Sequence, residues 1–173
     1  MVTKTFSTLK TTAMKTWIMM RHGKSSWELQ VSDGDRPLNE RGINDAHRMG
    51  AFLATKQLTI DAAYTSPANR AAHTGLIVLR ELNLPFHKLT VSNMLYDFSG
   101  DDVLEFVRCL PDEQNTIITF GHNHACTALA HSLGGFDGNN IPTASAVLFR
   151  FDVSLWSSIT TGVAECFSPK MLV

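Results

Sequence analysis

The sequence predicts an α/β fold, a three-layer α/β/α sandwich with a mainly parallel sheet, from two observations. Short apolar runs typical of buried strands alternate along the chain with longer segments whose apolar residues recur at the helical period. The length of 173 residues and the 44% hydrophobic content match one globular domain that buries its own core. Right-handed crossovers between parallel strands place helices on both faces of such a sheet.

The first half of the chain contains two strand–helix pairs. The apolar run 16–20 ends at Arg-His-Gly, which predicts a buried strand entering a loop. An asparagine can cap the next segment, 39–57, where apolar residues follow the helical period. Residues 62–65 form the second expected strand. A Ser-Pro pair then supplies an N-cap and a first-turn proline for a helix over 66–82.

The second half continues the alternation. Residues 88–95 are the third expected strand, and a pair of aspartates opens a short helix over 101–110 that ends at Leu-Pro. The fourth strand is expected over 116–120, and the Gly-His-Asn that follows leads into a helix reaching about residue 133. After a glycine-rich turn, residues 146–151 form the fifth expected strand.

Residues 1–13 are expected to be a flexible extension, and residues 14–173 a single domain. The first stretch is rich in Thr, Ser and Lys and has no acidic residue. An organellar transit peptide is the alternative, although such peptides are usually rich in Arg and this stretch has none. Three cysteines without a C-x-x-C pair favour a reducing cytosol over a disulfide framework, so a cytoplasmic location is expected.

The charge balance indicates no large electrostatic partner. With 15 basic and 16 acidic residues, the formal net charge is −1, which gives no basis for binding nucleic acid or an anionic membrane surface. No apolar run approaches the roughly 20 residues of a membrane-spanning helix. Any site for an anion must therefore be local, and the oligomeric state is not indicated.

Polar residues follow three of the predicted strands. Arg21 and His22 come directly after the first strand, Arg70 comes shortly after the second, and His122 follows the fourth. In doubly wound sheets, ligands bind beyond the carboxyl ends of the strands, where the strand order reverses. We therefore expect these side chains to meet at one edge of the sheet.

The four residues have the chemistry that a dianionic phosphoryl group requires. Arg21 and Arg70 can bind its oxygens with pairs of hydrogen bonds and stay charged at every physiological pH. One neutral imidazole can attack phosphorus, while a second imidazole, protonated beside the anion, offsets the developing charge. The pattern thus predicts phosphoryl transfer without a metal or a cofactor.

Other motifs fit less well. The Gly-Lys-Ser at 23–25 resembles the end of a P-loop, but Ile18 stands where that motif needs glycine. No G-x-S-x-G elbow of a serine hydrolase occurs. His122, His124 and Cys126 are close in sequence, but their spacing matches no zinc pattern, so no metal site is expected.

Four sequence blocks together resemble the histidine phosphatase superfamily, also called the phosphoglycerate mutase-like family. They are RHGKS at 21–25, DRPLNERG at 35–42, TSPANRA at 65–71 and GHN at 121–123. The blocks, and the tail segment from Ile-Pro-Thr at 141–143 onward, are most similar to the small SixA-type phosphohistidine phosphatases. The resemblance implies a phosphoglycerate mutase-like fold.

The resemblance also implies a role for each matching residue. It makes His22 the phosphorylated nucleophile and Arg21 and Arg70 the phosphate-binding arginines. His122 becomes the second histidine of the pocket, and Ser25 is a candidate contact to phosphate.

Two positions depart from the family pattern. Trp27 stands near a position where many members have an asparagine, so the substrate contacts there are left open. The glutamate that relatives place after the third strand is absent, and Asp97 is the candidate general acid in its place, with a loop or capping role as the alternative. Asp35 and Arg36 are interpreted as loop residues.

The resemblance implies a metal-independent phosphatase with a phosphohistidine intermediate. A weak general acid suits a phosphohistidine substrate, because imidazole, unlike an alkoxide, leaves phosphorus readily. Loops of about a dozen residues or fewer after the first and third strands predict an open pocket. Phosphohistidine on a signalling or phosphotransfer protein is the expected substrate. A broad small-molecule phosphomonoesterase and a non-catalytic phosphate- or phosphoprotein-binding module are the alternatives.

Overall fold

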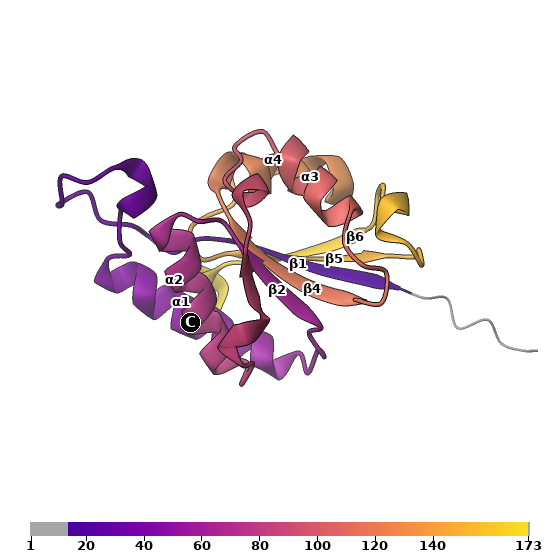
Figure 1. Ribbon diagram of the computed structural model, residues 1–173, viewed down its shortest axis with the longest axis horizontal. Coiled ribbons are helices and arrows are strands. Elements are labelled where there is room, and N and C mark those ends of the chain that lie inside the picture. Colours follow the sequence, from indigo (N-terminus) through magenta and orange to yellow (C-terminus); the bar gives the residue numbers. More distant parts are fainter. Residues whose placement is uncertain (1–13, 173) are drawn as a thin grey trace, which may run out of the picture.

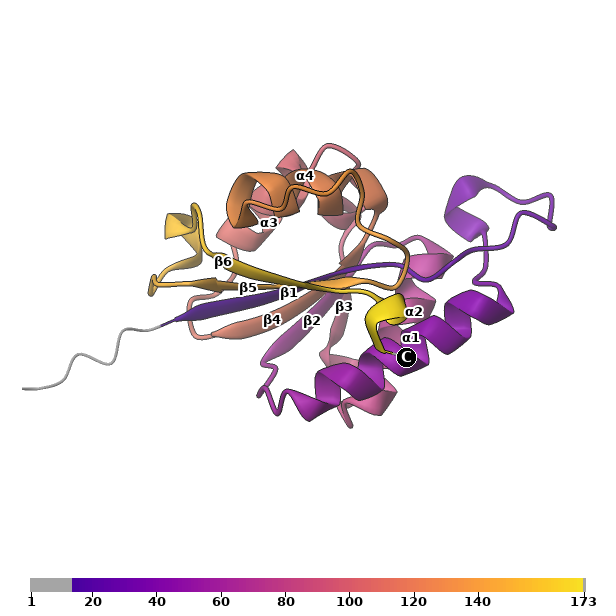
Figure 2. The same ribbon diagram turned by 180° about the vertical axis from the view of Figure 1, so that it is seen from behind.

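The computed structural model describes residues 14–172, so the expected extension over 1–13 lies outside the described part. The strands are β1 (Lys15–Arg21), β2 (Ala62–Thr65), β3 (Leu89–Val91), β4 (Thr116–Gly121), β5 (Ala146–Phe151) and β6 (Val163–Phe167). The helices are α1 (Glu40–Thr55), α2 (Asn69–Glu81), α3 (Asp101–Arg108) and α4 (Asn123–Gly134). Helices α1 and α2 cover one face of the sheet and α3 and α4 the other (Figures 1 and 2). The predicted three-layer sandwich is confirmed.

The six strands form one sheet in the order β3-β2-β4-β1-β5-β6. The first four strands in the chain are parallel to one another, whereas β5 runs antiparallel to β1 and β6 antiparallel to β5. The mainly parallel sheet matches the prediction, but β6 was not predicted. It lies at the sheet edge with none of its residues fully buried, so it lacks the apolar pattern that marks the inner strands.

Each face of the sheet has its own hydrophobic core. Strand β1 lies between β4 and β5 and is buried along all but its last residue. Trp17 and Met19 belong to the core under α3 and α4, whereas Ile18 and Met20 belong to the core under α1 and α2. This alternation fixes the register of β1 and so the position of the loop that follows it. None of the described helices is long and apolar enough to span a lipid bilayer.

Two element boundaries differ from the prediction. Helix α2 begins at Asn69, and its cap residue is Ala68. The Ser66 hydroxyl, which was expected to cap the helix, lies further back in the chain, where it accepts from the Ala68 amide at 3.2 Å and is 2.8 Å from His122 Nε2. Strand β3 ends at Val91, before residue 95, because the backbone turns into a short 3₁₀ helix over Asn93–Leu95. The predicted cap of α1 is confirmed, since the Asn39 side chain accepts a hydrogen bond from the Gly42 amide at 2.9 Å.

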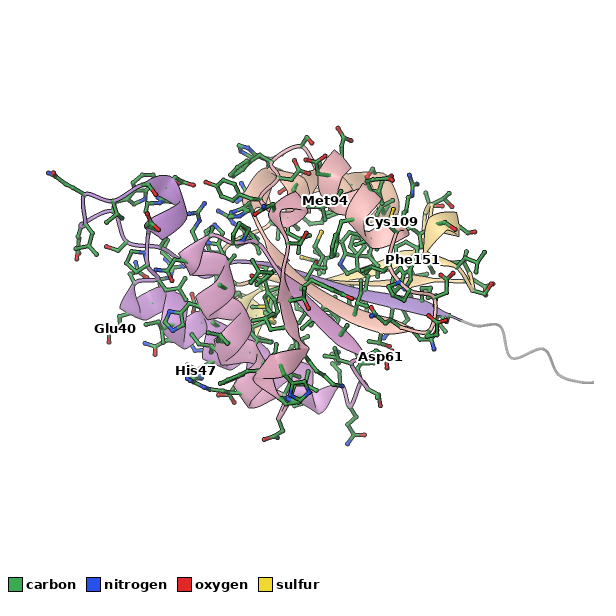
Figure 3. The ribbon with its side chains drawn as sticks, viewed as in Figure 1. Glu40, His47, Asp61, Met94, Cys109 and Phe151 are labelled. Carbon is green, nitrogen blue, oxygen red and sulfur yellow. The ribbon has the colours of Figure 1, made fainter. Side chains whose placement is uncertain are left out.

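The two ends of the sheet differ in what they carry. Glu40, at the start of α1, lies at the end toward which β1 points, whereas Asp61 and Phe151 lie toward the opposite end (Figure 3). There the Asp61 carboxylate accepts hydrogen bonds from the Asn115 and Thr116 amides at 2.8 and 2.9 Å. These bonds tie the amino ends of β2 and β4 together, and the polar residues predicted to carry the function are all at the other end.

The loop between β1 and α1, residues 22–39, is longer than expected and projects from the body of the molecule (Figure 1). It contains a 3₁₀ turn over Asp33–Asp35 and a single bridge between Ser25 and Leu38. The second loop, between β3 and α3, is as short as predicted. The longer loop supplies one wall of the pocket described below.

Two glycines hold the start of this loop against α1. A Cβ atom on Gly23 would lie 2.6 Å from the carbonyl oxygen of Gly42, and a Cβ on Gly42 would collide with the backbone of Lys24. The Gly23 amide also donates to the Thr74 hydroxyl at 3.0 Å, which fixes the loop to α2. The residue between β1 and Gly23, His22, is therefore held by backbone contacts on both sides.

Replacement of Gly42 by alanine should destabilise the fold and displace the loop after β1. We expect Gly42→Ala to lower the free energy of unfolding by about 1–3 kcal/mol, because the added methyl meets backbone that cannot rotate away. Urea denaturation measures the change. The control is Gly34→Ala, whose added Cβ would meet only the Ser32 hydroxyl at 3.8 Å. Equal stability of the two variants would contradict the proposed contact.

Candidate active site

A pocket of about 450 Å³ opens beyond the carboxyl ends of β1, β2 and β4. The side chains of Arg21, His22, Arg70 and His122 all line it. The structure thus brings together four residues from three distant segments of the chain. Ser25, the candidate phosphate contact, is buried and lines the same pocket.

His22 is held as a single tautomer by the loop after β1. Its Nδ1 lies 2.7 Å from the Gly23 carbonyl oxygen, which can only accept, so Nδ1 carries the proton. Nε2 is therefore unprotonated, and its lone pair accepts a hydrogen bond from Arg70 Nε at 3.2 Å. Burial lowers the pKa of His22 to about 4, and the neighbouring guanidiniums add to this while the bond to Gly23 opposes it. The imidazole is a neutral base at physiological pH.

His122 caps the start of α4 and faces His22, with 5.3 Å between the ring centroids. Arg70 Nη2, which can only donate, lies 3.3 Å from Nδ1 of His122. The proton of the ring is therefore on Nε2, which donates to the Ser66 hydroxyl at 2.8 Å. Burial, together with the nearby His22 and Arg70, lowers the pKa of His122 to about 3. Both histidines are thus uncharged.

Two guanidiniums lie next to these imidazoles. Arg70, in the first turn of α2, is only 2% exposed and contacts both histidines. Arg21, at the end of β1, donates through Nη1 to the Asn123 and Asn140 side chains at 3.0 Å each. Its Nε is buried and has no hydrogen-bond partner within residues 14–172. A bound anion can supply the missing acceptor.

Asp97 does not line the pocket. Its carboxylate accepts hydrogen bonds from the Ser99 and Gly100 amides, each at 2.7 Å, and from the Ser99 hydroxyl at 3.0 Å. Burial opposes ionisation, but these bonds outweigh it and hold the pKa of Asp97 below its usual range. The structure therefore gives Asp97 the capping role that was its alternative, and offers no geometry for it as a general acid.

The loop over residues 22–39 brings three further charged residues to the pocket, Lys24, Asp33 and Arg36. Arg36 lies in the loop, as interpreted, but its side chain is buried against the pocket, under the ring of Trp27. Loop residues follow no periodicity that shows which way they point, so neither Asp33 nor Arg36 could be found from pattern alone. The only indication was their place within or beside the block at 35–42.

No group of three His, Cys, Asp or Glu side chains between residues 14 and 172 has an arrangement that could hold a metal ion. Of the residues considered for metal binding, His124 lines the pocket, whereas Cys126 is buried in the core under α4. Burial raises the pKa of the Cys126 thiol to about 12, which disfavours the thiolate that a metal would need.

Comparisons with known proteins agree with this geometry. The model of the histidine phosphatase superfamily (branch 1) matches residues 17–91. An uncharacterized protein of Mycobacterium tuberculosis, Rv1276c, is 31% identical over 139 residues, which cover 78% of this chain and 82% of the relative. A 2,3-bisphosphoglycerate-dependent phosphoglycerate mutase of Azorhizobium caulinodans is 40% identical over 70 residues, or 39% of this chain and 34% of the mutase.

Solved structures share the fold. The protein histidine phosphatase SixA complexed with tungstate has a TM-score of 0.77 and 24% identity, covering 91% of this chain and 99% of that chain. A putative phosphohistidine phosphatase SixA from Agrobacterium tumefaciens has a TM-score of 0.71 and 22% identity, covering 78% and 90%. The family match and the mycobacterial relative agree with the two arginines and two histidines found at the sheet edge. This chain belongs to the histidine phosphatase superfamily.

Proposed function

We propose that the protein is a phosphatase that forms a phosphohistidine on His22 and acts on phosphohistidine of a signalling or phosphotransfer protein. The observation that carries the proposal is the unprotonated Nε2 of His22, which opens on a pocket lined by Arg21, Arg70 and His122. A neutral imidazole nucleophile beside fixed cations is the arrangement that phosphoryl transfer needs.

The reaction would proceed in two displacements. In the first, the hydrogen bond from Arg70 Nε to His22 Nε2 breaks and the Nε2 lone pair attacks phosphorus, so that a P–N bond forms and the bond from phosphorus to the leaving group breaks. Arg21 and Arg70 hold the phosphoryl oxygens and offset their charge. In the second, water attacks phosphorus, the bond to His22 breaks, and inorganic phosphate leaves. No step in this scheme uses a metal ion.

His122 would become charged only when substrate is bound. Its Nδ1 faces Arg70 on the pocket side, while Nε2 is bonded to Ser66. A phosphoryl dianion in the pocket favours the protonated ring, because an opposite charge nearby raises the pKa of an imidazole. His122 could then donate to a phosphoryl oxygen or to the leaving group without moving away from Ser66.

The pocket carboxylate is a poor proton donor for the leaving group, which supports a phosphohistidine substrate. Among the described residues, Asp33 is the one carboxylate lining the pocket. Hydrogen bonds from Tyr96 and Arg70 hold the pKa of Asp33 below its usual value, although partial burial opposes them. A carboxylate held in this form is a poor proton donor, whereas an imidazole leaving group needs little help.

A broad phosphomonoesterase that acts on small metabolites is the second candidate. It is favoured by the fold shared with a mycobacterial glucosyl-3-phosphoglycerate phosphatase, Rv2419c, at a TM-score of 0.62. A non-catalytic phosphate- or phosphoprotein-binding module is the third possibility. The neutral His22 argues against it, because simple binding of an anion does not require an unprotonated ring nitrogen in the pocket.

A phosphoryl group should be trapped on His22. Quenching the protein with a ³²P-labelled phosphodonor should give an acid-labile, alkali-stable label that maps to His22. The His22→Ala variant should show no label and lose at least about a thousandfold in kcat/KM, since the nucleophile itself is gone. His131→Ala is the matched control, because His131 is exposed on α4. Activity that survives His22→Ala would overturn the mechanism.

The two enzyme hypotheses predict opposite substrate preferences. We expect kcat/KM for a phosphohistidine-containing phosphotransfer protein to exceed that for a hexose phosphate by at least about a hundredfold, because an alkoxide is the poorer leaving group. Release of inorganic phosphate from both substrates measures the ratio. A preference for the sugar ester would instead establish the small-molecule phosphomonoesterase.

The pKa of His22 should lie far below that of an ordinary histidine. In the protein without added phosphate, its ring should stay neutral until the pH falls to about 4. Below that value Nε2 is protonated and cannot attack, so the nucleophile is lost with falling pH and not with rising pH. The His22 Cε1 proton resonance, assigned with His22→Gln, reports the midpoint. A midpoint near 6.5 would show that the ring is not desolvated as described.

A further inference from the structure

The carboxylate of Asp33 lies between two guanidiniums of the pocket. Its Oδ2 is 2.8 Å from Arg70 Nη2 and accepts a hydrogen bond from the Tyr96 hydroxyl at 2.6 Å. Its Oδ1 is 3.2 Å from Arg36 Nε. A carboxylate and a phosphoryl group present similar oxygens to a guanidinium. The donors on one side of the pocket therefore already hold an anion that belongs to the chain.

Arg36 is a buried cation with unused donors. Its side chain is 10% exposed and lines the pocket. Within residues 14–172 neither Nε nor Nη1 has an acceptor in hydrogen-bonding geometry, so the contact of Nε with Asp33 is an ion pair only. Buried donors of a charged group are costly when unpaired. Arg36 is thus poised to bind a ligand with more acceptors than Asp33 offers.

Trp27 holds this guanidinium in place. The indole ring covers it with 3.5 Å between Arg36 Cζ and the ring centroid, and the indole itself is 74% exposed. Stacking of this kind fixes the plane of the guanidinium and excludes water from one of its faces. The orientation of Arg36 is therefore set before any ligand arrives.

We propose that Arg36 is a third phosphoryl-binding guanidinium and that the Asp33 carboxylate is an internal competitor which the phosphoryl group displaces from Arg70 and Arg36. This inference rests on the proposed function and extends it to two residues outside the Arg-His-Gly segment, one of which, Arg36, lies in the block at 35–42. The Asp33 side chain is 47% exposed, so it can rotate into solvent. Its backbone carbonyl also accepts from Arg70 Nη1, a contact that can persist while the carboxylate moves.

Charge determines which anion, the phosphoryl group or the Asp33 carboxylate, binds the two arginines. A phosphoryl dianion and the Asp33 carboxylate repel each other, so they do not share Arg70. The dianion carries more charge and more acceptors, and it takes the arginines when bound. Once inorganic phosphate forms, the returning carboxylate competes with it. Asp33 therefore weakens product binding and favours release.

Binding of inorganic phosphate to two variants tests both parts of the proposal. Isothermal titration calorimetry on the full chain should give a Kd about three- to tenfold lower for Asp33→Asn, because the competing charge is gone. It should give a Kd about tenfold or more higher for Arg36→Met, because a charge-assisted bond is lost. Asp35→Asn and Arg41→Met are the matched controls, since they remove the same charges outside the pocket; both should stay within about twofold of the wild type.

Each part of the proposal can be overturned by one result of these titrations. Equal changes in the phosphate Kd of Asp33→Asn and Asp35→Asn would show that only overall charge matters. That result would overturn the proposal that Asp33 competes with phosphate. An unchanged Kd for Arg36→Met would overturn the proposal that Arg36 binds the phosphoryl group. If thermal melting shows that Arg36→Met is unfolded, Arg36→Lys replaces it and should bind phosphate more weakly than the wild type, because lysine keeps the charge but not the fork.

The measurement separates this inference from the proposed function. Phosphate binding needs no turnover, so opposite shifts in the two variants would support the inference even if no phosphohistidine were hydrolysed. Hydrolysis of phosphohistidine with phosphate affinities that do not respond to Asp33 or Arg36 would leave the function standing and remove the inference.

Discussion

The burial of one guanidinium, that of Arg70, is the constraint around which the rest of the pocket is arranged. A cation that is only 2% exposed needs acceptors on every side. Nε donates to His22, Nη2 reaches both His122 and Asp33, and Nη1 reaches the Asp33 backbone. Segments following β1, β2 and β4 are therefore joined through a single side chain, and each acceptor is positioned by the need to satisfy it.

Burial, together with this arrangement, explains why both imidazoles are uncharged. Each accepts a hydrogen bond from Arg70 on the nitrogen that faces it and donates with the other, His22 to the Gly23 carbonyl and His122 to Ser66. A proton added to either ring would face a fixed positive charge. The net charge of the whole chain is only −1, yet this pocket concentrates positive charge. The attraction for an anion is local and is strengthened by the low dielectric around it.

The sequence predicted those parts that follow from regular structure. Alternating strands and helices predict the three layers, and the rule for parallel strand ends predicts that Arg21, Arg70 and His122 meet. What could not be predicted depends on loops and edges. Strand β6 has no buried face to impose a pattern. Asp97 has the same appearance in sequence whether it caps a loop or donates a proton, and only its bonds to backbone amides distinguish the two.

The exposed position of Trp27 has a practical consequence. The other two tryptophans, Trp17 and Trp156, are fully buried in the core under α3 and α4, where an indole emits at shorter wavelength than one in water. The long-wavelength part of the emission spectrum therefore comes from the ring that lies on Arg36. The molecule contains its own fluorophore at the wall of the pocket, and it needs no attached dye to follow what happens there.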